Sequence, residues 1–280
     1  MGDKPTVWIT GAKGFIGSEL ATRFEANGYR VAATDTELSV CEYERLEDFA
    51  VRVKPDVIVN CAAINRSVTG LSNRIKAYEV NALGARNVAV VANAVGAFFV
   101  QVSTDDVYPV RMPEPANEFD TPHPETPYGK SKRAGEVMVR DAVKDCLVVR
   151  SSWIYSINGG MLKTALDAAR EGKLIPVRTD QYASPTSISF FADFMIRAIE
   201  KRATGVLHIA SRGVTSRFDF LSKALEFCGY DPSRIIKPET DLVTSEQVLL
   251  ETLMLDMFGE NIATWEEDLK TYLTEVGMAQ

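Results

Sequence analysis

Histidine and cysteine are scarce in this chain of 280 residues, which has two of the first and four of the second. His123 and His208 lie far apart in the sequence with no cluster of other metal-ligating residues beside them, so we predict no metal site. The cysteines are widely spaced and include no CxxC pair, which fits reduced thiols better than a disulfide framework. This pattern favours a cytoplasmic protein.

The sequence also lacks an excess of positive charge and a long hydrophobic run. Its formal net charge of -7 and pI of about 5.1 argue against a surface for nucleic acid or for an anionic membrane. No segment approaches the roughly 20 apolar residues that a membrane span needs, and the N-terminus has no signal-peptide pattern. A hydrophobic content of 46% indicates a globular protein with one large domain, or with a main domain and a smaller lobe.

Short, β-branched apolar runs alternate with longer helical segments over the first 150 residues. The runs predict strands at 7–10, 30–34, 56–60, 97–103 and 146–152, and the periodic segments predict helices at about 15–26, 42–53, 72–95 and 127–143. The strands are apolar almost throughout, as in strands that are buried on both faces. Strands separated by helices of this length predict an α/β fold with a doubly wound parallel sheet.

The pattern is looser after residue 152. We expect helices at 160–171, 189–201 and about 216–228, a strand at 205–211, a loop at 231–245 and two short closing helices. Because these elements are few and short, we expect residues 1–152 to form the main domain. Residues 153–280 would mainly form a smaller lobe, with some segments returning to the sheet.

A glycine-rich turn, "TGAKGFIG", follows the first predicted strand and opens the first helix. Gly11 would permit the tight turn, Gly14 would let the backbone approach a pyrophosphate, and Gly17 would allow close packing of helix on strand. Asp35 ends the second strand, where a carboxylate accepts from a ribose 2′-hydroxyl. These features predict an NAD(P) site that slightly favours NAD, because Asp35 would repel a 2′-phosphate, although Lys13 could partly offset this preference.

Tyr128 and Lys132, in "TPYGKSKRAGE", lie four residues apart and would share one helix face. A phenol is a poor acid–base group at neutral pH unless a neighbouring ammonium stabilises its phenolate. The segment "VSTDDVY" ends the fourth strand and offers the hydroxyls of Ser103 and Thr104, which could orient a carbonyl beside the tyrosine. With the glycine turn before it, this pair predicts a proton-transfer site rather than a solvated helix face.

These motifs resemble the extended short-chain dehydrogenase/reductase superfamily, and within it the dTDP-4-dehydrorhamnose reductase family. The matching segments include "GAKGFIG", "KPDVIVNCAA", "YEVNALGARNVA", "VVRSSWIY", "DQYASPTS" and "GVLHIAS", and they cover roughly residues 5–211. The resemblance implies a Rossmann domain that binds NAD(P), a substrate-binding lobe, and reduction of a 4-keto-6-deoxy sugar nucleotide at C4.

The resemblance also implies roles for individual residues. Thr104, Tyr128 and Lys132 would be catalytic, with Tyr128 as the proton donor. The implied cofactor-binding residues are Gly11, Lys13, Gly14, Phe15, Ile16, Gly17, Asp35, Cys61, Ala62, Ala63, Asn81, Ser103, Tyr128 and Lys132. The implied substrate-binding residues are Asp105, Asp106, Trp153 and Gln181.

The chain departs from the family near its C-terminus. The Arg-Pro and Asn-Ser motifs that contribute to the nucleotide end of the substrate in the family have no counterpart in "DLVTSEQVLLETLML". Arg178, Arg212 or Arg217 could instead supply the positive charge, and each is equally consistent with a solvated surface residue.

Two other functions fit the same motifs. "STDDVY" also resembles the strand end of sugar-nucleotide 4,6-dehydratases, in which Asp105 and Asp106 would act as acid and base. The regulatory subunit of methionine adenosyltransferase, a dinucleotide-binding partner protein, resembles the same family and is not an enzyme. The apolar helix at 87–95 would be core, and an exposed face on it could form a homodimer.

Overall fold

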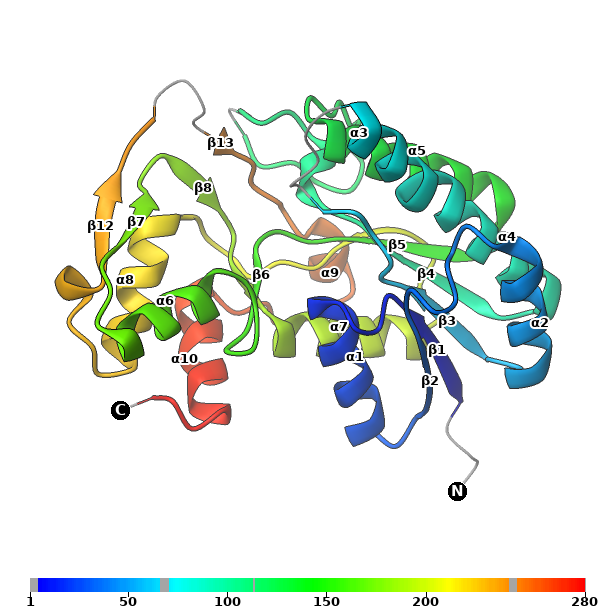
Figure 1. The fold of residues 1–280 in the computed structure, drawn as a ribbon, viewed down its shortest axis with the longest axis horizontal. Helices are drawn as coiled ribbons and strands as arrows, with labels where there is room; N and C mark the ends of the chain where they lie inside the picture. The colour runs from blue at the N-terminus through cyan, green and yellow to red at the C-terminus, as the bar shows by residue number, and fades with distance from the viewer. Residues whose placement is uncertain (1–4, 66–70, 113, 242–245, 280) are drawn as a thin grey trace. The chain divides into compact units, whose positions relative to one another are not determined.

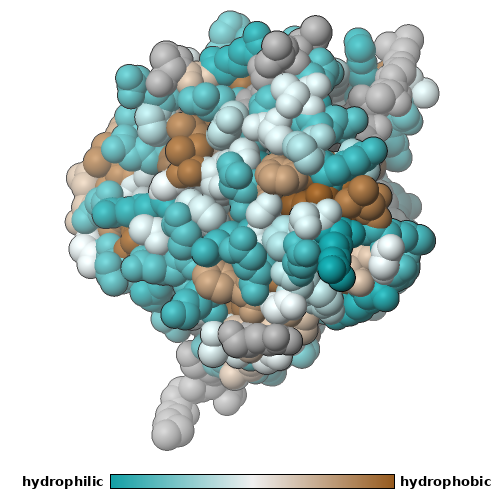
Figure 2. Space-filling model, turned by 90° about the vertical axis from the view of Figure 1, so that its left-hand side faces the viewer, coloured by the Kyte–Doolittle hydropathy of each residue, from teal (hydrophilic) through white to brown (hydrophobic). Residues whose placement is uncertain are grey.

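The computed structural model describes residues 5–65, 71–112, 114–241 and 246–279. The chain divides into two compact units. Unit 1 comprises Met1–Tyr108, Thr121–Arg150 and Phe194–Leu207, and unit 2 comprises Pro109–Asp120, Ser151–Asp193 and His208–Gln280. None of the described helices is long and apolar enough to cross a membrane. On the face shown in Figure 2, hydrophobic residues form small patches among hydrophilic ones.

Unit 1 is built on a six-stranded sheet in the order β10-β5-β4-β3-β1-β2. Its strands are β1 (Thr6–Thr10), β2 (Arg30–Thr34), β3 (Val57–Asn60), β4 (Phe98–Val102), β5 (Cys146–Arg150) and β10 (Gly205–His208). Strands β1 to β5 pair in parallel, and β1, β3, β4 and β5 are buried along their whole length. The predicted doubly wound parallel α/β fold is therefore confirmed. The near-continuous apolar strands are explained by this fold, because both faces of its sheet are covered.

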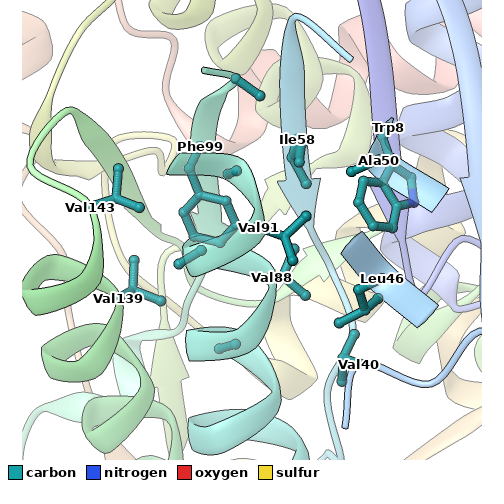
Figure 3. Packing of buried hydrophobic residues seen from close by; sticks show 14 of the residues in the cluster. Trp8, Val40, Leu46, Ala50, Ile58, Val88, Val91, Phe99, Val139 and Val143 are labelled. Carbon is teal, nitrogen blue, oxygen red and sulfur yellow. The ribbon is translucent and has the colours of Figure 1, made fainter. Parts of the chain in front are cut away.

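Helices cover both faces of this sheet (Figure 1). The helices of unit 1 are α1 (Phe15–Ala26), α2 (Tyr43–Val53), α3 (Leu71–Tyr78), α4 (Ala85–Val95), α5 (Pro127–Ala142) and the second half of α7 (Ile188–Glu200). Figure 3 shows the core between the sheet and helices α2, α4 and α5, where Trp8, Ile58 and Phe99 meet Leu46 and Val91. All five of these side chains are fully buried.

The helix predicted at 72–95 is interrupted. Between α3 and α4, residues Glu79–Gly84 form a π-helical segment. Such a segment holds one extra residue per turn and is common at functional sites. It places the backbone of Asn81 so close to α5 that a Cβ at Gly135 would lie 2.1 Å from the Asn81 carbonyl oxygen. Only glycine at 135 allows this approach.

Unit 2 contains short strands and four helices among its described residues. The helices are α6 (Gly160–Glu171), α8 (Arg217–Phe227), α9 (Leu253–Met257) and α10 (Trp265–Glu275), and the strands are β6 (Ile154–Tyr155), β7 (Ile175–Arg178), β8 (Gln181–Ala183), β9 (Thr186–Ser187), β11 (Thr215–Ser216), β12 (Ile236–Glu239) and β13 (Glu246–Gln247). The first half of α7 also belongs to this unit. Asp268 of α10 is buried and accepts hydrogen bonds from Tyr155, Ser187 and Ser211. One carboxylate thus ties three segments of unit 2 together.

The prediction of a loop throughout 231–245 was wrong. Pro232–Arg234 form a short 3-10 helix, and Ile236–Glu239 form β12, which pairs in parallel with β7. Three of the four β12 residues are exposed and one is proline, so the segment carries no apolar signal for a strand. The segment forms a strand because it pairs with β7, and its own composition does not predict one.

The close approach at Gly135 generates a stability prediction. We expect Gly135→Ala to lower the free energy of unfolding by about 1–3 kcal/mol, because the added methyl group collides with a backbone carbonyl that cannot move independently. Denaturant unfolding followed by circular dichroism measures this change. Val137→Ala, on the exposed side of the same helix, is the control and should change stability by less than about 0.5 kcal/mol. A Gly135→Ala protein as stable as wild type would contradict the close contact.

Candidate active site

The glycine-rich turn between β1 and α1 forms one wall of a pocket of about 590 Å³ in unit 1. Gly11 has a φ of +67°, and a Cβ there would lie 2.6 Å from the backbone nitrogen of Ala62. A Cβ at Gly17 would lie 2.3 Å from the carbonyl oxygen of Gly11. Both glycines are therefore required by the geometry, and the turn lies directly against the segment that follows β3.

The pocket brings together half of the residues predicted to bind the cofactor. Gly11, Lys13, Gly14, Asp35, Cys61, Ala62 and Ala63 all line it. Phe15, Ile16 and Gly17 form the first turn of α1, whose N-terminal amides are unpaired in a helix and favour anions. The pocket therefore brings the glycine turn, the end of β2 and the segment after β3 to one surface.

At the end of β2, charged residues surround the predicted ribose site. The Asp35 carboxylate accepts a hydrogen bond of 2.9 Å from the backbone amide of Lys13, and so ties the glycine turn to β2. The Lys13 ammonium lies 2.8 Å from a carboxylate oxygen of Glu37. The hydrogen bond from Lys13 lowers the pKa of Glu37 to about 2, and the same contact raises the pKa of Lys13. Sequence reasoning found Lys13 and Asp35 but not Glu37.

Asn81, in the π-helical segment, holds two parts of unit 1 together. Its side chain accepts from the backbone nitrogen of Ile64 at 2.7 Å and donates to the carbonyl oxygen of Ile64 at 2.9 Å. It also donates to the hydroxyl of Ser131 on α5, again at 2.9 Å. Asn81 thereby fixes the segment Cys61–Ile64, which lines the pocket, relative to the helix that carries Tyr128 and Lys132.

The end of β4 continues into a buried polar turn. Thr104 donates its hydroxyl to Asp105 at 3.0 Å and accepts from the backbone nitrogen of Asp106 at 3.2 Å. Asp105 and Asp106 are both buried, at 9% and 5% exposure. A Cβ at Gly129 would lie 2.0 Å from the carbonyl oxygen of Asp106. The absence of a side chain at 129 thus lets the first turn of α5, with the half-buried Tyr128, reach the turn at Thr104.

Lys132 lies one turn after Tyr128 and is 4% exposed. Its ammonium donates to the carbonyl oxygen of Val102, the last residue of β4, at 2.7 Å. Burial lowers the pKa of Lys132 to about 8, while the negative charge of Glu136 opposes this shift. The bond to Val102 places the ammonium at the end of β4, the strand that leads into Thr104.

A buried ion pair that sequence reasoning missed supports this arrangement. Glu136, one turn after Lys132, is 1% exposed and receives two hydrogen bonds from Arg150, at 2.9 and 2.7 Å. Ser103 also donates to Glu136, at 2.6 Å, and Arg150 donates to the Tyr108 hydroxyl at 2.7 Å. Ser103 was predicted to bind the cofactor, whereas its hydroxyl here contacts Glu136. Glu136 and Arg150 looked like ordinary helix and strand-end charges in the sequence.

Trp153 and Gln181, predicted to bind the substrate, belong to unit 2. Trp153 has a φ of +33°, in the left-handed region that side chains rarely adopt. The Arg217 guanidinium lies over its ring, 4.7 Å from the centroid. Gln181 begins β8, which pairs with β11 and β13. Among the residues that the structure describes, no group of histidine, cysteine, aspartate and glutamate could hold a metal ion.

The buried ammonium generates a prediction about stability and pH. The pKa of Lys132 falls from 10.5 in the unfolded chain to about 8 in the folded protein. Below pH 8 the lysine is charged in both states, and burying the charge lowers the free energy of unfolding. This loss of stability disappears as the pH rises from 8 to 10.5, because the folded protein then holds a neutral lysine. We expect Lys132→Met to be more stable than wild type by about 2 kcal/mol at pH 7, after the loss of the bond to Val102 is deducted. The advantage should shrink toward pH 10.

Chemical denaturation at several pH values measures this effect. Lys130→Met is the matched control, because Lys130 lies on the same helix with an exposed side chain. It should change stability by less than about 0.5 kcal/mol, with no dependence on pH in this range. A Lys132→Met protein that is less stable than wild type at pH 7 would show that the ammonium stabilises the fold.

Comparisons with known proteins identify the family of this chain. The family described as RmlD substrate binding domain matches residues 5–278. The chain is 30% identical over 277 residues to the spore coat polysaccharide biosynthesis protein SpsK of Bacillus subtilis. The matched region covers 96% of this chain and 97% of SpsK. It is 34% identical over 236 residues to the dTDP-4-dehydrorhamnose reductase of Mycobacterium tuberculosis, covering 81% of this chain and 77% of that protein.

Solved structures give the same result. The dTDP-4-dehydrorhamnose reductase of Bacillus anthracis, in complex with NADP, superimposes with a TM-score of 0.89 at 30% identity, over 97% of this chain and 99% of that one. The orthologue from Clostridium acetobutylicum has a TM-score of 0.88 at 29% identity, over 98% and 100% of the two chains. The predicted resemblance is confirmed: the chain belongs to the RmlD substrate binding domain family, whose similar members include dTDP-4-dehydrorhamnose reductases.

Proposed function

We propose that this protein is an NAD(P)H-dependent reductase of a 4-keto-6-deoxy sugar nucleotide, with dTDP-4-dehydrorhamnose as its substrate. Family membership supports the reaction class. The observation that carries the proposal is the position of Lys132, whose buried ammonium lies one turn after Tyr128 and donates to the carbonyl oxygen of Val102 at the end of β4. A purely dinucleotide-binding protein would have no need to bury an ammonium at this point, because burial opposes its charge.

The pocket in unit 1 fits a nicotinamide dinucleotide. The backbone of Gly11 and Gly14, with the first turn of α1, would hold the pyrophosphate, and Asp35 would accept from the adenosine ribose. Ala62 and Ala63 would contact the cofactor through their backbone. The Bacillus anthracis relative in complex with NADP supports this assignment. When bound, the reduced nicotinamide supplies the hydride that reduces the substrate carbonyl.

The chain's own residues would manage the proton and the carbonyl oxygen. Tyr128 would donate its phenolic proton to the oxygen that becomes a hydroxyl. Lys132 would stabilise the phenolate that remains, because a nearby ammonium favours the negative form of a phenol. Thr104 would donate a hydrogen bond to the same oxygen, in exchange for its present contact with Asp105. Asn81 would act indirectly, by holding α5 against the segment after β3.

The substrate assignments rest on the family resemblance and on chemistry. Asp105 and Asp106 would lie near the sugar, since both flank the Thr104 hydroxyl. Trp153 and Gln181 would contact the sugar nucleotide from unit 2, which is proposed to be the substrate-binding lobe. The aromatic face of Trp153 suits an apolar sugar face or a base.

A turnover assay tests the proposed function. Purified protein with NADH or NADPH and a panel of 4-keto sugar nucleotides should consume the reduced cofactor, measured as loss of absorbance at the nicotinamide band. A dehydratase that used Asp105 and Asp106 as acid and base would transform the sugar with no net consumption of cofactor. Cofactor binding with no turnover of any sugar nucleotide would instead favour a regulatory binding protein and would overturn the proposal.

The role of Tyr128 predicts the behaviour of a single variant. We expect Tyr128→Phe to lower kcat by roughly 10²–10⁴-fold, because a general acid contributes about that much. The Kd for the reduced cofactor, measured by its fluorescence, should stay within about twofold of wild type. Tyr43→Phe is the control and should keep full activity, because the Tyr43 hydroxyl lies on helix α2, where it donates to Glu47. An active Tyr128→Phe protein would rule out this tyrosine as the proton donor.

The preference for NAD(H) over NADP(H) is a finer part of the proposal. Two carboxylates, Asp35 and Glu37, surround the predicted ribose site, and Glu37 engages the ammonium of Lys13 that would otherwise attract a 2′-phosphate. The negative charge should therefore disfavour NADP(H).

We expect Glu37→Gln to shift the ratio of NADPH affinity to NADH affinity by roughly fivefold toward NADPH, because it removes one charge and releases Lys13. Fluorescence titration with each cofactor measures the two Kd values. Glu42→Gln, which removes an equally exposed charge paired with Arg45, is the matched control and should leave the ratio unchanged. An unchanged ratio in Glu37→Gln would show that the ion pair of Lys13 does not govern cofactor choice.

A further inference from the structure

Ser103, the residue after β4, has contacts in the structure that differ from the role predicted for it. The family resemblance implies that Ser103 binds the cofactor, while its neighbour Thr104 is proposed to hold the substrate carbonyl. Ser103 is not among the residues that line the pocket of about 590 Å³ at the glycine turn. It is 7% exposed, and its hydroxyl donates to Glu136 of α5 at 2.6 Å. All the residues of this contact belong to unit 1.

The Glu136 carboxylate accepts hydrogen bonds at both of its oxygens. One oxygen accepts from Ser103 and, at 2.9 Å, from Arg150. The other oxygen accepts from Arg150 at 2.7 Å and from Arg133 at 3.0 Å. Burial alone would raise the pKa of Glu136, but the hydrogen bonds and the charge of Arg150 lower it below its ordinary value. Ser103 therefore donates to an ionised acceptor, and such a bond is roughly twice as strong as one between neutral groups.

This bond commits the hydroxyl of Ser103. A serine hydroxyl has a single proton to donate, and here that proton goes to Glu136. Ser103 could donate to a bound cofactor only by removing one donor from a buried carboxylate, and the loss of a hydrogen bond to a buried charge is costly. The backbone of Ser103 is held as well, because its amide donates to the carbonyl oxygen of Val149 in β5 at 2.6 Å.

Two successive turns of α5 contact two successive residues at the end of β4. Lys132 donates to the carbonyl oxygen of the last strand residue at 2.7 Å, and Glu136, one turn later, accepts from Ser103. Thr104 is the next residue, with extended backbone and 8% exposure. The place of the Thr104 hydroxyl therefore depends on the bond between Ser103 and the helix that also carries Tyr128.

We propose that Ser103 is a positioning residue: through Glu136 it holds the Thr104 hydroxyl in the place, relative to Tyr128, that reduction of a carbonyl requires, and it does not bind the cofactor. Catalytic groups must be held within about 0.5 Å of their working geometry by hydrogen bonds of the residues around them. The bond from Ser103 to Glu136 supplies this support for Thr104. The inference rests on the proposed function for the roles of Thr104 and Tyr128, while the contacts of Ser103 stand without it.

Steady-state kinetics of Ser103→Ala test this role. We expect kcat to fall by roughly 10–100-fold, because a displacement of about 1 Å in a catalytic group can cost that much. The KM for the sugar nucleotide and the Kd for the reduced cofactor should each stay within about twofold of wild type, since the lost interaction acts only in the transition state. A Kd for the cofactor that rises by roughly tenfold, with kcat unchanged at saturation, would show that Ser103 binds the cofactor and would overturn the inference.

A double-mutant cycle separates positioning from a general loss of structure. In a protein that already carries Thr104→Ala, Ser103→Ala should lower kcat by less than about twofold, because the hydroxyl that Ser103 positions is then absent. An equal loss in both backgrounds would mean that Ser103 acts by another route, and would overturn the inference. Tyr29→Phe is the matched control: it removes a hydroxyl that donates to the carboxylate of Glu200 in the same unit, and it should leave kcat unchanged.

Crystal structures of wild type and Ser103→Ala test the same point without turnover. We expect the Thr104 hydroxyl of the variant to lie more than about 0.5 Å from its wild-type position after superposition of the sheet. A Thr104 hydroxyl that superimposes on that of wild type would overturn the inference, even if the reductase proposal holds. Wild-type protein that reduces no keto sugar would overturn the reductase proposal instead, and the two structures would still decide whether Ser103 positions Thr104.

Discussion

The arrangement of unit 1 depends on one buried carboxylate. Glu136 lies on α5, and its partners come from the ends of two neighbouring strands: Ser103 follows β4 and Arg150 ends β5. Because both Glu136 and Arg150 are almost fully buried, neither charge can turn to water, and each would be very costly without the other. The pair therefore fixes the rotation of α5 against the sheet, and with it the positions of Tyr128 and Lys132.

The same carboxylate influences the chemistry. Burial strongly disfavours the Lys132 ammonium, and the negative charge of Glu136 is the first of the opposing contributions that keep the pKa of this lysine near 8 rather than lower. A hydrophobic residue at 132 would fit the surrounding burial better. Burial of a charged lysine at this position opposes folding at neutral pH, which is the expected signature of a group kept for function.

The sequence predicted correctly those helices and strands whose own residues carry a clear hydrophobic pattern. The helices at 15–26 and 160–171 and the strand at 30–34 were found with the observed bounds, because periodicity and β-branched runs define them locally. The π-helical segment, β12 and the short strands of unit 2 were missed. They depend on partners distant in the sequence: Gly135 for the first and β7 for the second. Glu136 and Arg150 were missed for the same reason. A charged residue is predicted to be exposed unless its buried partner is known, and this partner is distant in the sequence.

The cofactor pocket was the most predictable part of the site, because close backbone contacts in it require glycine at particular positions. Gly11 and Gly17 are dictated by approaches of 2.6 and 2.3 Å that no other residue permits. Recognition of a substrate follows a looser rule, since a cation for a diphosphate can be supplied from many backbone positions. The glycine turn is therefore easier to predict from the sequence than the residues that bind the nucleotide end of a substrate.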